Sequence, residues 1–111
     1  MKYPLTFIVF GVNIKMKLYL IHCGYYDAEV GGGLFESHIN YFVCADSFES
    51  ARINAKLIPE FAAKRMHIDG LQEIQAVGGF DIMLKENQSL KGSSQIVNFK
   101  HRDLAPKPPS T

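Results

Sequence analysis

The sequence predicts an α+β protein: a small mixed β-sheet in the order β-β-α-β-β, with one main helix packed on one face. Three observations lead to this class. The 111 residues fit one domain. Apolar residues make up 47% and charged residues 21%, which excludes a disordered chain. Stretches of β-favouring residues flank a single stretch that has the period of a helix.

The first two strands are predicted from residue type and alternation. Residues 17–23 are rich in β-favouring side chains and end at Gly24. Residues 24–35 contain four glycines and are predicted to form a loop. The triple glycine within it is not interpreted as a phosphate-binding turn, because that turn has a strand directly before it and a helix directly after it. In residues 37–44, apolar side chains at every second position indicate the second strand.

A helix is predicted next. It begins at Asp46 and Ser47, since Asp46 and Glu49 have the spacing of a reciprocal cap. Apolar residues then recur at helical spacing up to residue 62. Pro59 removes a helical hydrogen bond and clashes with the preceding turn, so we expect the regular helix to end there and a short helical turn to follow.

A hairpin is predicted after the helix. Its strands are residues 71–77 and 80–85, joined by Gly78 and Gly79. A tight primed turn needs positive φ angles, and glycine adopts them readily. Residues 95–99 are a candidate for an extra C-terminal edge strand.

The chain divides by composition into three parts. Residues 16–85 form the single α+β domain, and residues 86–111 form a polar, proline-containing tail that we expect to be largely flexible. Residues 1–15 are interpreted as an N-terminal extension, because Met16 precedes the first convincing strand. The alternative is an added N-terminal edge strand at residues 6–10.

Charge and cysteine content narrow the function classes. A formal net charge of +1, without a cluster of basic residues, disfavours nucleic acid and anionic membranes as partners. No stretch is long and apolar enough for a membrane span. The two cysteines, Cys23 and Cys44, indicate a reducing compartment, so we expect a cytoplasmic protein with both thiols free. No cofactor is predicted.

Polar residues are expected to converge at one edge of this sheet. If the first two strands pair antiparallel, Cys23 faces the start of the second strand, which carries Glu36 and His38. The helix then returns His67 and Asp69 to the same edge. These five residues are the candidate binding site.

Three interpretations of this edge remain open. His38, His67, Asp69 and Cys23 are the ligand types that a metal ion uses, but no compact metal motif is present, so no metal is assigned. Cys23 could act as a nucleophile beside His22, His38 or His67, of which His22 is the poorest partner because adjacent strand residues point to opposite faces. The polar groups could also be purely structural and bond the backbone at a loop.

Four short motifs follow one another in order. They are a glycine that closes the first strand (Gly24), Glu-x-His (Glu36 and His38), His-x-Asp (His67 and Asp69), and Gly-aromatic-x-Ile (residues 79–82). On these motifs, residues 17–85 resemble the small bacterial domain-of-unknown-function family numbered 1543. The chain departs from that pattern at Ile39, where an acidic residue is frequent, and at Tyr25, where a second glycine is usual. The resemblance implies no activity, but its motifs include four of the five candidate residues.

We therefore expect a cytoplasmic, non-enzymatic binding or assembly module that forms a homo-oligomer. The expectation depends on a single-layer sheet, whose open edges and uncovered face another copy can pair with or cover. The alternative is a small hydrolase- or lyase-type enzyme that uses the same edge, with or without a metal. The sequence does not identify a small-molecule or protein ligand.

Overall fold

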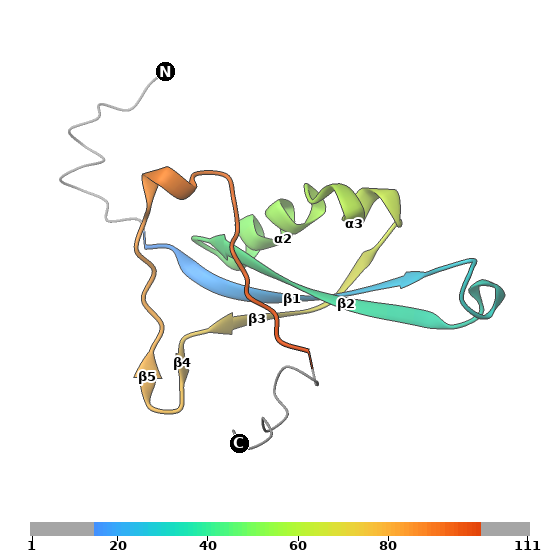
Figure 1. Cartoon of the computed structure of the whole chain (residues 1–111), viewed down its shortest axis with the longest axis horizontal. Coiled ribbons are helices and arrows are strands. Elements are labelled where there is room, and N and C mark those ends of the chain that lie inside the picture. Colours follow the sequence, from blue (N-terminus) through green and yellow to red (C-terminus); the bar gives the residue numbers. More distant parts are fainter. Residues whose placement is uncertain (1–14, 101–111) are drawn as a thin grey trace, which may run out of the picture.

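The computed structural model describes residues 15–100, which contain a three-stranded sheet (Figure 1). Strand β1 (Lys17–Tyr26) lies between β2 (Glu36–Ala45) and β3 (His67–Ile74), and both neighbours run antiparallel to it. The predicted α+β class is confirmed. The remaining elements are η1 (Gly31–Gly33), α2 (Phe48–Lys56), α3 (Pro59–Ala63), β4 (Ala76–Val77), β5 (Phe80–Asp81) and η2 (Gln88–Leu90).

Alternation along β1 gives the sheet two different faces. On one face, the side chains of Tyr19, Ile21 and Cys23 are fully buried and pack with Ala51, Ala55, Phe61 and Met66 of the helical layer. Figure 1 shows α2 and α3 lying over this side of the sheet. We call this the core face. The opposite side, which no helix covers in the part of the chain described, is called the outer face.

The start of α2 lies one residue later than predicted. Ser47 is the N-cap, and its hydroxyl oxygen accepts a hydrogen bond from the Ser50 amide at 3.1 Å. The expected cap at Asp46 and Glu49 is therefore wrong, because Ser47 has the extended backbone that an N-cap residue needs. Glu49 instead pairs with Arg52.

Pro59 ends the first helix and begins the second, as the sequence predicts. It occupies the first turn of α3, where the missing N–H costs nothing. The Tyr41 hydroxyl of β2 donates a hydrogen bond to Glu60, which fixes α3 over the sheet. Burial raises the pKa of Tyr41, and the bond to Glu60 adds to that rise.

A tight turn after α3 leads the chain into β3. The Met66 amide donates to the Phe61 carbonyl at 2.9 Å, and the Arg65 amide donates to Ala62 at 3.1 Å. Arg65 has a φ of 49°, the left-handed conformation that closes many helices. This turn places His67 at the first position of β3, beside the end of β1.

A β-bulge interrupts the pairing of β1 with β3. His22 lies opposite Gly70 and Cys23 lies opposite Ile68, so Asp69 is an extra residue with no partner on β1. A bulge of this kind shifts the alternation of the strand by one residue. As a result, Ile68 and Leu71 both pack against the core, while Asp69 stays on the outer face.

The predicted hairpin forms only in part. Gly78 and Gly79 make the turn with φ angles of 59° and 87°, as expected for a primed turn. The strand boundaries predicted around them are wrong, because residues 71–74 belong to β3 and pair with β1. The hairpin is a separate two-stranded sheet of β4 and β5.

The remaining predictions concern the ends of the chain and the cysteines. Residues 95–99 form no strand, and the alternative edge strand at residues 6–10 lies outside the described residues. Cys23 and Cys44 are both free, since Cys23 is buried on the core face and Cys44 is exposed near the other end of the sheet.

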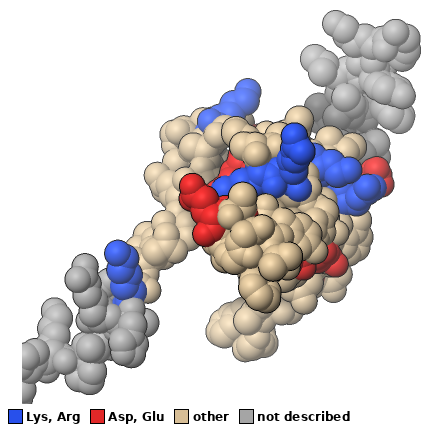
Figure 2. Space-filling model, turned by 90° about the vertical axis from the view of Figure 1, so that its right-hand side faces the viewer, with Lys and Arg blue, Asp and Glu red and all other residues tan. Residues whose placement is uncertain are grey.

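Two further properties of the described residues concern membrane spans and surface charge. No helix in residues 15–100 is long and apolar enough to cross a membrane. Figure 2 shows Lys and Arg side chains gathered in the upper part of its view, the side on which Figure 1 places the helical layer.

Candidate functional site

Four of the five candidate residues meet on the outer face. Glu36 and His38 alternate on β2, and His67 and Asp69 alternate on β3, so each pair projects to one side of its strand. His38 and His67 are both register partners of Gly24, one on each side of the central strand. The site is thus a row across three strands, at the end of the sheet next to the glycine-rich loop.

The four side chains contact one another in a closed ring. The Nε2 atom of His38 lies 2.9 Å from Glu36 Oε1 and 3.3 Å from Asp69 Oδ2. The Nε2 atom of His67 lies 2.5 Å from Glu36 Oε2 and 3.1 Å from Asp69 Oδ1. Each carboxylate therefore contacts both imidazoles, through different oxygens. We call this group the histidine–carboxylate cluster.

Gly24 leaves the space into which the cluster fits. A Cβ atom at this position would lie 2.5 Å from Glu36 Oε2, 2.7 Å from Asp69 Oδ2 and 2.7 Å from His67 Nε2. Real Cβ atoms essentially never approach other heavy atoms so closely. A Cβ at this position would push these side-chain ends apart, so the contacts between the two side chains from β2 and the two from β3 depend on the glycine.

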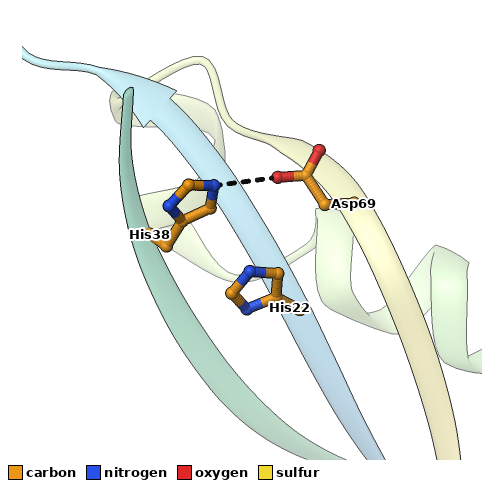
Figure 3. Close-up of side chains that lie close together, drawn as sticks. All are labelled: His22, His38 and Asp69. Atoms are coloured by element: carbon orange, nitrogen blue, oxygen red, sulfur yellow. Dashed lines mark ion pairs between the residues drawn. The ribbon is translucent and has the colours of Figure 1, made fainter. Parts of the chain in front are cut away.

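Two further residues flank the cluster on the outer face. The rings of His22 and His38 are stacked, with centroids 4.8 Å apart and planes 7° apart, and Figure 3 shows them on neighbouring strands beside Asp69. His22 Nδ1 lies 2.7 Å from Asn40 Oδ1 on β2, so it acts as the donor in that hydrogen bond. The sequence-based candidate site does not include His22 or Asn40, although His22 was expected at this edge of the sheet. His22 is two residues from Gly24 on β1, and Asn40 is two residues from His38 on β2. This alternation in the sequence indicates that both residues lie on the same face as the cluster.

The structure does not bring Cys23 to the cluster, and this corrects the sequence-based site. Adjacent residues of a strand point to opposite faces, so Cys23 enters the core while its neighbour Gly24 lies beneath the cluster. Burial, and then the charge of Asp69, raises the pKa of the Cys23 thiol. A buried thiol with a raised pKa is a poor nucleophile and a poor metal ligand.

The cluster contains a set of metal-ligand atoms. One nitrogen or oxygen atom from each of Glu36, His67 and Asp69 lies within 4.8 Å of the other two, and the same holds for His22, His38 and Asp69. The four cluster side chains are 28–46% exposed, so water and ions reach them. Imidazole and carboxylate are the common protein ligands of Zn²⁺ and related divalent ions.

Comparison with known proteins adds no relative. No protein-family model, curated protein or solved structure matches this chain. The resemblance to family 1543 therefore stays a prediction.

Proposed function

We propose that this chain is a non-enzymatic binding module and that the histidine–carboxylate cluster binds a first-row divalent metal ion such as Zn²⁺. One observation carries the proposal: two imidazoles and two carboxylates from β2 and β3 converge over the space that Gly24 leaves open. Two carboxylates supply the negative charge that a dication requires, and the imidazoles supply neutral nitrogen ligands.

The openness of the site favours binding over catalysis. Enzymes hold substrates in concave pockets with convergent polar groups. The cluster side chains instead lie on a sheet face, with His38 41% and His67 46% exposed. His67 and Asp69 border an open hollow beside β3, but Glu36 and His38 do not line it. A bound ion would link β2 to β3 across β1, so its main effect would be on the stability of the sheet. Two free thiols fit a reducing compartment, and we propose the cytoplasm as the location.

Calorimetric titration with Zn²⁺ tests this function. We expect saturable binding to the wild-type chain and at least about tenfold weaker binding to Asp69→Asn, because a neutral amide is a poorer ligand. Glu73→Gln is the matched control, since it removes another β3 carboxylate, which accepts a hydrogen bond from Gln75 outside the cluster. It should bind Zn²⁺ like the wild type.

Thermal unfolding provides an independent measurement. An ion that binds only the folded chain adds about 2.7 kcal/mol at a free concentration of one hundred times its Kd, and a chelator removes this gain. Acid should also weaken binding, because imidazole ligands must be deprotonated. Absence of heat and of stabilisation with Zn²⁺, Co²⁺ and Mn²⁺ would reject the proposal.

A further inference from the structure

The way in which each carboxylate contacts both imidazoles indicates how many metal ions the cluster can hold. Glu36 offers Oε1 to His38 and Oε2 to His67, while Asp69 offers Oδ2 to His38 and Oδ1 to His67. The four contacts therefore separate into two sets of three atoms with no atom in common. Each set consists of one imidazole nitrogen and one oxygen from each carboxylate.

The nitrogen–oxygen distances within each set suit ligands of one ion. Ligand atoms at about 2.0–2.2 Å from a metal lie roughly 3 Å apart in octahedral and about 3.4 Å apart in tetrahedral coordination. The His38 set has separations of 2.9 and 3.3 Å, and the His67 set has 3.1 and 2.5 Å. Only the distance between His67 and Glu36 is too short, so these two atoms must move apart when an ion binds.

We propose that the histidine–carboxylate cluster holds two divalent ions bridged by both carboxylates. One ion binds His38, Glu36 Oε1 and Asp69 Oδ2, and the other binds His67, Glu36 Oε2 and Asp69 Oδ1. Bridged ions of this kind lie about 3.5–4 Å apart in proteins. The inference rests on the proposed metal-binding function and specifies how many ions that site takes.

His22 acts as a positioning residue for the first ion. Its hydrogen bond to Asn40 fixes one tautomer, and its ring lies flat against that of His38. The lone pair of an imidazole nitrogen lies in the ring plane, so two parallel stacked rings cannot both aim at one ion. His22 therefore holds the ring of His38 upright instead of joining it as a ligand.

Charge balance indicates what completes the site. Two dications held by two carboxylates and two neutral imidazoles retain excess positive charge, and the exposed side of the cluster leaves coordination positions open. An oxyanion or a hydroxide that spans both ions neutralises this charge. The pair is thus a binding site for a phosphate-type anion on the outer face.

Metal stoichiometry tests the inference. Native mass spectrometry of the Mn²⁺-loaded wild-type chain should show two ions per chain, and electron paramagnetic resonance should show the spectrum of coupled ions. His38→Ala and His67→Ala should each retain a single ion with an uncoupled spectrum. Glu73→Gln, which removes a carboxylate of β3 outside the cluster, is the control and should retain two ions.

The outcomes separate this inference from the proposed function. A single ion in the wild type, lost in both His38→Ala and His67→Ala, leaves the metal-binding function intact and overturns the two-ion site. No bound ion overturns both. Inorganic phosphate should bind the loaded wild type and lose at least about tenfold in affinity in either single-ion variant, because the second contact is missing. Equal phosphate affinity in all three would contradict the bridged anion.

Discussion

Gly24 is the residue on which the histidine–carboxylate cluster depends most directly. It lies in the central strand, between His38 on one side and His67 on the other. Glycine in a strand interior weakens the strand, and often marks a place where other groups approach the backbone closely. Here the approaching groups are the side chains of the cluster, at distances that any Cβ would obstruct.

Gly24→Ala should therefore abolish most of the metal affinity. The added methyl group lies within 2.7 Å of three cluster residues, so these side chains must move apart. We expect Zn²⁺ binding to weaken by at least about tenfold, as when ligands are misplaced. The control is Gly70→Ala, because a Cβ at Gly70, also on the sheet, meets nothing within 4 Å. Unchanged Zn²⁺ affinity in Gly24→Ala would argue that the ion binds elsewhere.

The sequence predicts the members of the cluster but not its geometry. The Glu-x-His and His-x-Asp spacings put each pair on one face of a strand, and antiparallel pairing brings both to one end of the sheet. Spacing alone does not reveal that the residue between them must lack a side chain. Cys23 was included in the candidate site because it lies at the same end of the sheet, although its side chain points to the core face.

At the scale of elements, the errors in prediction have local causes. The β-favouring stretch from residue 71 to 77 contains the end of one strand and the start of another, and only the pairing with β1 separates them. The Asp69 bulge lets both Ile68 and Leu71 of β3 pack against the core, three positions apart, which a regular strand does not allow. The predicted fold class is still correct, because it depends on the order of the elements and not on their exact bounds.

The start of α2 makes a prediction about pH. Hydrogen bonds from the side chains of Ser50 and Ser47 hold the pKa of Asp46 below its ordinary value. A folded-state pKa below the unfolded one contributes stability above the unfolded value of about 3.9, which is lost as pH falls through the folded value. Asp46→Asn should therefore be less stable than the wild type at pH 7, and the two should converge in acid.

Urea unfolding over a series of pH values measures this difference. The negative charge of Asp46 also favours the start of the helix through the helix dipole, and this contribution disappears on protonation as well. A stability difference that stays constant from neutral to acidic pH would show that the carboxylate charge contributes nothing.

At the scale of the molecule, the two faces of the sheet are covered very differently. The helices bury the core face, whereas the outer face combines the polar cluster at one end with an apolar area near the other. That area contains Phe42, which is 54% exposed, and the half-buried Leu18, Leu20 and Ile74. Exposed apolar patches of this kind in small proteins mark association sites.

We accordingly predict that the chain associates through this apolar area into a homo-oligomer. Light scattering at high concentration should give at least twice the chain mass of 12.5 kDa. Phe42→Ser should raise the dissociation constant by about tenfold or more, as for a central aromatic contact. Phe80→Ser removes an even more exposed ring, from the β4–β5 hairpin, and should leave the mass unchanged. A monomeric wild type would refute the prediction.

Gly24 also determines which alignment of the strands is allowed. A slip of β1 by one residue would turn its buried side chains to solvent, and the loss of their burial makes this alignment unfavourable. A slip by two residues keeps every side chain on its own face, and alternation alone does not distinguish it from the native pairing. Such a slip would bring His22 or Tyr26 between His38 and His67, where a Cβ would push the cluster side chains apart. The single missing side chain thus favours the native alignment on the face that contributes least to the core.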